Sequence, residues 1–182
     1  MNEVRDLFFS QKALAALFSV TNKLQLQGGK YLRDLTIRQI LAIPAILHAP
    51  EGKATINYIA RTLGTTKQSA KQIINVMEKK KYISTASSER DKRAVDVTIT
   101  PEGKRAFRIC SKRTDIFLAD IFSDFSTEDL ETFCTLLGKL YRFDGRDDIK
   151  MIYPEENADI IRQHHQNYIK RRSNNNEQSN DI

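Results

Sequence analysis

Apolar residues recur at helical spacing through most of this chain, and two short stretches alternate apolar and polar residues instead. Leu7, Leu14, Leu17, Phe18 and Leu24 repeat at this spacing, which predicts a helix over 6–27. The next two residues are glycines, which we expect to end that helix. The same spacing, bounded by Thr, Ser, Gly and Pro, predicts further helices over 36–47, 55–63, 66–80, 100–125, 126–141 and 155–172.

The two alternating stretches, "YISTAS" at 82–87 and "VDVTIT" at 95–100, predict short strands joined by the polar loop "SERDKRA" at 88–94. The helices over 55–63 and 66–80 are separated by "GTT", which is typical of a helix-turn-helix. The hairpin that follows makes this unit a winged helix. We therefore predict a mainly α fold with a small β-hairpin wing (α+β), flanked by long N- and C-terminal helices.

This pattern divides the chain into four predicted parts. Residues 1–34 form a long N-terminal helix, and 35–100 form the winged helix-turn-helix domain. Residues 101–144 form long C-terminal helices. Residues 145–182 form a linker, a short helix and a polar tail, "SNNNEQSND", whose composition is typical of disorder.

Charge changes this picture because it is unevenly distributed. The 182 residues carry a formal net charge of +6, which favours negatively charged partners. Eight basic and three acidic residues lie between Thr66 and Arg93, whereas five basic and nine acidic residues lie between Ser111 and Asp148. The basic segment contains the helix-turn-helix and the wing. It is either a nucleic-acid-binding surface or a solvated polar face.

Several function classes find no support in the sequence. The N-terminus lacks the apolar run of a signal peptide and no stretch reaches the roughly 20 apolar residues of a membrane span, so we expect a cytoplasmic protein. No catalytic set or phosphate-binding glycine loop is present, so we expect neither an enzyme nor a cofactor. We expect no metal site either, because the adjacent His164 and His165 would point in different directions on a helix.

The helix over 66–80 has the properties of a DNA recognition helix. Its apolar stripe of Ala70, Ile73, Ile74 and Met77 can anchor it in the protein. Gln side chains can pair with adenine and Lys side chains with guanine, while Thr and Ser at the helix N-terminus suit phosphate contacts. The predicted DNA-binding residues of this helix are Thr66, Lys67, Gln68, Ser69, Lys71, Gln72 and Asn75.

The loop between the strands supplies a second predicted contact. Arg90, Lys92 and Arg93 can reach a flanking minor groove, whose negative potential attracts arginine. The carboxylate of Asp91 would repel phosphate unless it has a partner within the protein. A hydrogen bond that orients Arg93 would provide that partner. The alternative is that this segment is only a mobile polar loop.

The segments "IARTLGTTKQSAKQIINVMEKKKYI" and "RDKRAVDVTITPEGKRAF" resemble the MarR family of winged-helix transcription regulators. The shared features are the Leu-Gly at the end of the short helix, the D-x-R wing at Asp91 and Arg93, and the T-x-x-G at Thr100 and Gly103. The resemblance covers roughly residues 35–107. It departs from the family at Lys81, where the family commonly has glycine at the end of the recognition helix.

The resemblance implies a homodimer, in which residues 1–34 are an N-terminal dimerisation helix and 101–144 are C-terminal dimerisation helices that intertwine with those of the partner. It also implies that the two recognition helices enter successive major grooves of a near-palindromic operator. It places Arg93 in the minor groove, held by Asp91. It also implies a small-molecule effector between the dimer helices and the winged domain, for which Phe18, Asn22 and His48 are candidates beside core and cap roles. One branch of the family senses peroxide through an N-terminal cysteine. The cysteines here, Cys110 and Cys134, lie on later apolar stripes and are expected in the core.

Two functional hypotheses follow. The first is a sequence-specific double-stranded DNA-binding regulator, a repressor, with residues 66–80 in the major groove and 87–94 in the minor groove. The alternative is a winged-helix module that binds proteins or coats nucleoid DNA without sequence preference. The ratio of specific to non-specific affinity separates the two.

Overall fold

The computed structural model describes residues 2–50, 54–88, 92, 94–145, 168 and 170 of the 182-residue chain. Its elements are α1 (Asn2–Leu32), α2 (Ile37–Leu47), α3 (Ile56–Thr62), α4 (Lys67–Lys79), β1 (Ile83–Ser87), β2 (Val95–Ile99), α5 (Pro101–Ile121), α6 (Thr127–Tyr141) and the 3-10 turn η1 (Arg142–Asp144). The predicted fold class is confirmed, since the only sheet in the described residues is the two-stranded hairpin.

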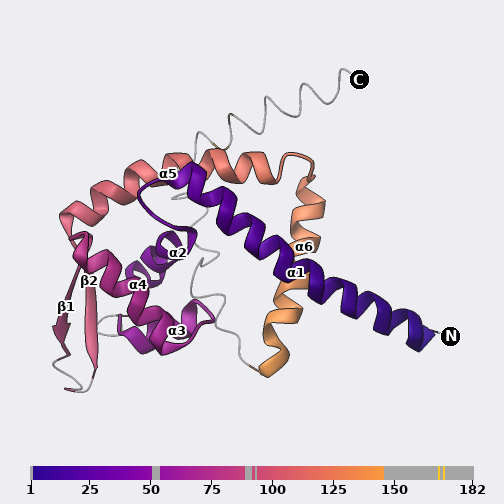
Figure 1. The fold of residues 1–182 in the computed structure, drawn as a ribbon, viewed down its shortest axis with the longest axis horizontal. Helices are drawn as coiled ribbons and strands as arrows, with labels where there is room; N and C mark the ends of the chain where they lie inside the picture. The colour runs from indigo at the N-terminus through magenta and orange to yellow at the C-terminus, as the bar shows by residue number, and fades with distance from the viewer. Residues whose placement is uncertain are drawn as a thin grey trace.

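The molecule has a small folded unit from which long helices project. Figure 1 shows α2, α3, α4 and the hairpin gathered on one side, with α5 running above them and α1 extending diagonally to a projecting N-terminus. The core belongs to that unit and is closed by the end of α1 and by α5. Its largest fully buried side chains include Leu32, Ile43, Ile59, Ile74 and Met77. The unit therefore has its own hydrophobic core.

Helix starts follow the polar signals in the sequence. Thr36, Thr55, Thr66, Thr100 and Ser126 each accept a hydrogen bond from the backbone N–H three residues later. Such N-caps satisfy amide groups that have no partner within the helix. All five starts were predicted from the sequence.

Helix ends were predicted less well. The prediction that α1 ends at Gly28 and Gly29 is wrong, because the helix continues to Leu32. A Cβ on Gly28 would lie 2.3 Å from Ile37 Cδ1, so this glycine serves close packing of α1 rather than termination. The helix ends where Arg33 adopts a φ of 55°. The stripe predicted to run to Phe125 is also too long, since α5 ends at Ile121.

The cysteine prediction is half right. Cys110 is buried, with its thiol 3.7 Å from the carbonyl oxygen of Leu32. Burial raises the pKa of this thiol, and the nearby Asp34 carboxylate raises it further. Cys134 is exposed, contrary to expectation, because α6 has no buried residue in the described part of the chain.

No helix in the described residues is long and apolar enough to cross a membrane. The predicted linker, last helix and polar tail over 145–182 lie outside the described residues, apart from Gly145, Tyr168 and Lys170.

Candidate nucleic-acid interface

A tight turn sets the angle between α3 and α4. Gly64 adopts a φ of 59° and donates its N–H to the carbonyl of Arg61 at 3.1 Å. The N–H of Thr65 reaches back to the carbonyl of Ala60 at 2.9 Å. The left-handed conformation favours glycine, which explains the Leu-Gly at this point. The chain then turns directly into α4, whose cap is Thr66.

The two faces of α4 have opposite roles. Ala70, Ile74 and Met77 are fully buried at 0% exposure, so the helix is rigidly held against the core. The other face carries polar and cationic side chains that reach solvent. Its exposed residues are Lys67, Gln68, Lys71, Gln72, Asn75, Val76 and Lys79. Five of the seven residues of this helix that were predicted to bind DNA thus lie together on one exposed face.

The remaining two, Thr66 and Ser69, form the N-terminal cap of α4. Ser69 donates its backbone N–H to Thr66 Oγ1 at 3.1 Å, and the two hydroxyl oxygens are 3.0 Å apart. Thr66 is exposed and Ser69 is half-buried. The cap therefore presents the positive end of the helix dipole to solvent, where an anion is favoured.

Glu78 is the one acidic residue of α4, and it is engaged inside the protein. Its Oε1 accepts hydrogen bonds from the backbone N–H of Thr85 at 3.1 Å and from the Thr85 hydroxyl. Thr85 belongs to β1, so this carboxylate ties the recognition helix to the wing. This role was not predicted from the sequence, although a lone acid on a basic helix is a usable signal.

Two of the three consecutive lysines at the end of α4, Lys80 and Lys81, make contacts within the protein. Lys80 donates from Nζ to the carbonyl of Asp34 at 2.6 Å and lies over the Tyr82 ring at 5.9 Å. Lys81 adopts a φ of 60°, and its carbonyl accepts a hydrogen bond from the Thr100 hydroxyl at 2.6 Å. The turn therefore takes the left-handed geometry that the family pattern predicts, with lysine in place of glycine.

The hairpin projects beside α4 in Figure 1. Its strands pair antiparallel with Ile83 opposite Ile99 and Ser87 opposite Val95. Val97 also donates its N–H to the carbonyl of Ala54 at 2.9 Å, which fixes the middle of β2 to the segment before α3. At the tip, Ser88 donates its N–H to the carbonyl of Ala94 at 3.0 Å, and Lys92 is exposed.

The other predicted wing residues, Arg90, Asp91 and Arg93, lie outside the described residues. The hydrogen bond from Asp91 to Arg93 therefore stays a prediction.

A groove of about 300 Å³ runs between α1, α2 and the helix-turn-helix. It is lined by Thr21, Leu24, Gln25, Ile37, Arg38, Leu41, Leu63, Gly64, Thr65 and Ile73. None of the three effector candidates lines it. Phe18 and Asn22 are exposed on α1, and His48 is the exposed C-cap of α2. In the described part of the chain, no group of three or more His, Cys, Asp or Glu side chains could hold a metal ion.

Comparisons with known proteins support this geometry. The MarR family model matches residues 33–94, which span the helix-turn-helix and reach the wing. The predicted resemblance to that family is confirmed over this segment. A search of curated proteins gave no significant match.

Several solved structures share the fold of this chain. The chain matches the Staphylococcus aureus MepR–DNA complex with a TM-score of 0.62 at 21% identity, over 70% of this chain and 95% of that one. It matches MOSR of Mycobacterium tuberculosis in complex with DNA with a TM-score of 0.61 at 16% identity. That match covers 71% of this chain and 96% of the MOSR chain. It matches PcaV of Streptomyces coelicolor, in complex with its natural ligand, at a TM-score of 0.63 and 14% identity. That match covers 72% of this chain and 91% of the PcaV chain.

Proposed function

We propose that this protein, whose winged-helix unit matches the MarR family, is a sequence-specific double-stranded DNA-binding transcriptional regulator that acts as a repressor. The observation that carries the proposal is the division of α4 into a fully buried apolar face and an exposed polar, cationic face. A helix in the major groove needs both, because one face must be rigidly held while the other bonds to base edges. Such a regulator acts in the cytoplasm.

Within this proposal, α4 lies in the major groove. Gln68, Gln72 and Asn75 contact base edges, and Lys67 and Lys71 contact guanine or phosphate. Thr66 and Ser69 receive a phosphate at the helix N-terminus. The engagement of Glu78 by Thr85 supports this docking, since it keeps the single carboxylate of the helix away from the phosphates.

The wing contacts the minor groove beside the site read by α4. The middle of the hairpin is fixed to α4 through Glu78 and to the segment before α3 through Val97. Because these hydrogen bonds hold the hairpin against the helix-turn-helix, the position of α4 on the DNA also sets the position of the wing. Arg93, oriented by Asp91, enters the minor groove, and Arg90 and Lys92 contact the flanking backbone.

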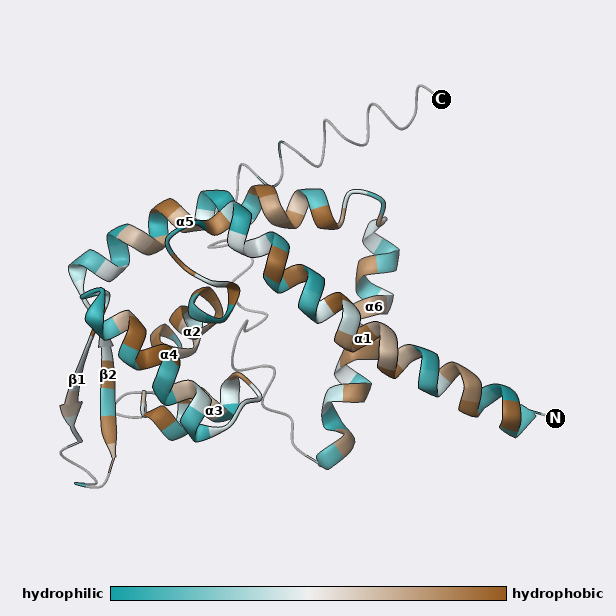
Figure 2. Cartoon of the chain, viewed as in Figure 1, coloured by the Kyte–Doolittle hydropathy of each residue, from teal (hydrophilic) through white to brown (hydrophobic). Residues whose placement is uncertain are grey.

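The active form is a homodimer on a near-palindromic operator. Large apolar side chains of α1 stay exposed in the single chain. The hydrophobic positions of that helix are coloured brown along its ribbon in Figure 2. The exposed fractions are 60% for Leu7, 59% for Phe8 and 68% for Phe18. Apolar surface of this extent marks a contact between proteins. A two-fold dimer presents two recognition helices to two related half-sites.

A small-molecule effector releases the repressor from its operator. The groove between α1, α2 and the helix-turn-helix supports this step, because it joins a dimer helix to residues beside α4. A ligand there changes the spacing of the two heads. The ligand complex of PcaV, which has the same fold, is consistent with such a site. Phe18, Asn22 and His48 remain candidates for a ligand that reaches beyond the groove.

Fluorescence anisotropy tests the proposal. Duplex DNA from the region upstream of the protein's own gene is titrated against a scrambled duplex at several salt concentrations. We expect a preference of about 10³-fold or more, two subunits per site and a steep decrease in affinity with salt. Equal affinity for the two duplexes would favour a nucleoid-coating module. Absence of binding at low salt would favour a protein-interaction module.

A pair of variants sharpens the test. Gln72→Ala should reduce the preference for the operator about tenfold or more, because it removes a base contact, while binding to scrambled duplex stays nearly unchanged. Lys112→Ala, an exposed residue of α5, should leave the preference unchanged and serves as control. A Gln72→Ala protein with full preference would exclude this helix face as the reader.

A further inference from the structure

Val76 is an exposed apolar side chain on the face of α4 that is otherwise polar and cationic. It is 43% exposed, and among the described residues of α3, α4 and the hairpin it is the only large hydrophobic side chain that is exposed. Its neighbours on the helix surface are Gln72, four residues before it, and Lys79, three residues after it. Single exposed apolar residues are common on proteins, so the position of Val76 is more informative than its exposure.

That position continues a line of side chains that we expect to contact bases. Gln68, Gln72 and Val76 are spaced by four residues, so they lie on successive turns of one helix face. Val76 is therefore about 6 Å further along the helix axis than Gln72. Because successive bases are about 3.4 Å apart, a helix that runs along the major groove places Val76 within about two base pairs of the pair that Gln72 contacts.

Packing of α4 holds Val76 in a fixed position. Ile74 and Met77, on the opposite face of the helix, are fully buried at 0% exposure. The carbonyl of Val76 accepts a hydrogen bond from the N–H of Lys80 at 3.2 Å, so the residue lies within the hydrogen-bonded part of the helix. A β-branched side chain in a helix has one strongly preferred rotamer. The two methyl groups of Val76 can therefore meet a ligand with little loss of conformational freedom.

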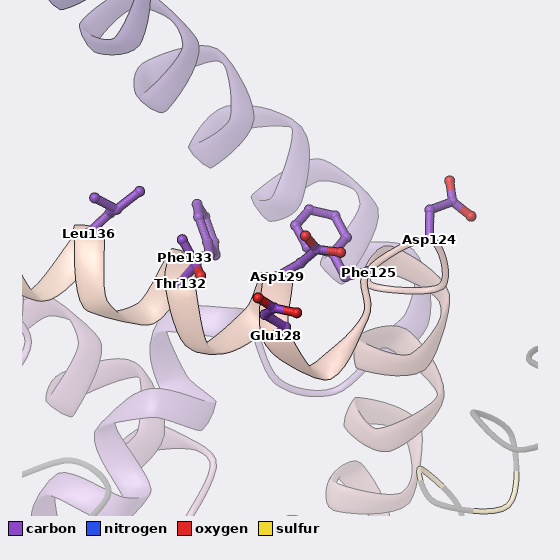
Figure 3. Close-up of a pocket in the computed structure, with 7 residues that line it drawn as sticks. All are labelled: Asp124, Phe125, Glu128, Asp129, Thr132, Phe133 and Leu136. Atoms are coloured by element: carbon purple, nitrogen blue, oxygen red, sulfur yellow. The ribbon is translucent and has the colours of Figure 1, made fainter.

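The surroundings of Val76 differ from those of exposed apolar side chains elsewhere in the chain. At the corner between α5 and α6, Phe125, Phe133 and Leu136 point to the same side and line a groove of about 520 Å³ (Figure 3). Grouped apolar side chains of this kind mark a contact between proteins. The other exposed side chains of α4 are polar or cationic instead. Val76 therefore suits a negatively charged, polar ligand that presents one small apolar group.

We infer that Val76 reads a thymine by contact with its 5-methyl group in the major groove. This rests on the proposed function, since it adds a base-reading residue to α4. The thymine methyl is the apolar group that the base pairs of unmodified DNA present in that groove. Gln72 contacts a base edge on one side of Val76, and Lys79 contacts phosphate on the other. Each half-site of the operator should then carry a thymine within about two base pairs of the pair read by Gln72.

Deoxyuridine tests this contact, because it lacks the methyl group of thymidine and keeps the same hydrogen-bonding groups. Thymines of the operator duplex are replaced by deoxyuridine in symmetric pairs, one in each half-site. Fluorescence anisotropy compares the affinity of the wild type for each modified duplex with that for the unmodified one. At one pair of positions the affinity should decrease about 15-fold, which corresponds to about 1.6 kcal/mol for two methyl contacts of about 0.8 kcal/mol each.

The variant Val76→Ala completes a double-mutant cycle with deoxyuridine. It removes both methyl groups of the side chain, so at that pair of positions its affinities for the two duplexes should differ by about twofold or less. Ile109→Ala is the matched control, because Ile109 is an aliphatic side chain of α5 that is 57% exposed. This control should keep the full decrease of about 15-fold. Circular dichroism confirms that both variants are helical.

The outcomes separate the inference from the proposed function. Suppose that the wild type prefers the operator over the scrambled duplex and no deoxyuridine pair changes its affinity. The inference then fails alone, as it does if Val76→Ala keeps the full effect of deoxyuridine. A wild type without preference for the operator would overturn the proposed function, and the inference with it.

Discussion

At the residue scale, Lys81 shows how the fold imposes a backbone conformation on an unsuited side chain. Its φ of 60° lies in the left-handed region, where a Cβ is disfavoured. The turn is fixed from both sides. Tyr82 donates its N–H to the carbonyl of Met77 at 2.9 Å, and the Lys81 carbonyl accepts the Thr100 hydroxyl. These bonds join the recognition helix to the wing and α5, so the conformation is retained despite its cost.

Replacing Lys81 by glycine should therefore stabilise the protein. We expect Lys81→Gly to raise the free energy of unfolding by about 1 kcal/mol, because glycine adopts this conformation without strain. Urea denaturation followed by circular dichroism measures the change. Lys71→Gly, in the middle of α4, is the control and should lower it by about 1 kcal/mol. Equal destabilisation by both substitutions would mean that Lys81 carries no strain.

At the scale of elements, Gly103 of α5 and Gly29 of α1 differ in whether a neighbouring element packs against them. A Cβ on Gly103 would lie 1.9 Å from the carbonyl oxygen of Tyr82, so α5 packs directly on the backbone between α4 and β1. Gly103 also donates its N–H to Thr100 Oγ1 at 3.0 Å, which explains the T-x-x-G motif as a cap and a close contact. Gly29 meets no atom within 4 Å of a Cβ, so the single chain gives no steric reason for glycine there.

These two positions predict opposite effects of the same substitution. Gly103→Ala should lower the free energy of unfolding by about 3 kcal/mol, since backbone atoms cannot move aside as a side chain can. Gly29→Ala should raise it by about 1 kcal/mol, because alanine is the better helix former and no neighbour is displaced. Urea denaturation of both variants measures the two changes in the free energy of unfolding. Tolerance of Gly103→Ala would show that α5 does not pack this closely on Tyr82.

At the scale of the whole molecule, the chain divides into a head with its own core and helices without one. In the described residues, α1 buries only Gly28 and Leu32 and α6 buries none. Both helices carry exposed aromatic and aliphatic side chains. A second copy can supply the missing contacts, and the stability of these helices then depends on association.

Thermal unfolding should accordingly depend on protein concentration. For a dimer that unfolds to separate chains, a tenfold increase in concentration should raise Tm by about 2 °C. Circular dichroism at two concentrations measures this, and sedimentation velocity reports the oligomeric state of the same samples. A Tm that is independent of concentration, with a monomer in sedimentation, would contradict the dimer.

Much of the candidate site could be predicted from the sequence because its signals are local. Helix caps depend on one hydroxyl and the amide three residues later, and Thr66 illustrates this. The two faces of α4 follow from the period of the helix, so the sequence alone identifies its exposed residues. The engagement of Glu78 and Lys80 was missed because their partners, Thr85 and Asp34, are distant or lie on other elements.

The sequence by itself determined the order of the described elements, the starts of α2 to α6, the wing strands and the polar face of α4, whereas α1 begins at Asn2, four residues before its predicted start. Each of these depends on residues within a few positions of one another. Only the tertiary structure decided that Gly28 lies inside α1 and packs against Ile37, and that Lys81 adopts a left-handed conformation. It also decided that Cys110 is buried while Cys134 is exposed. These outcomes depend on which surfaces meet in space, and periodicity identifies an apolar face without identifying what covers it.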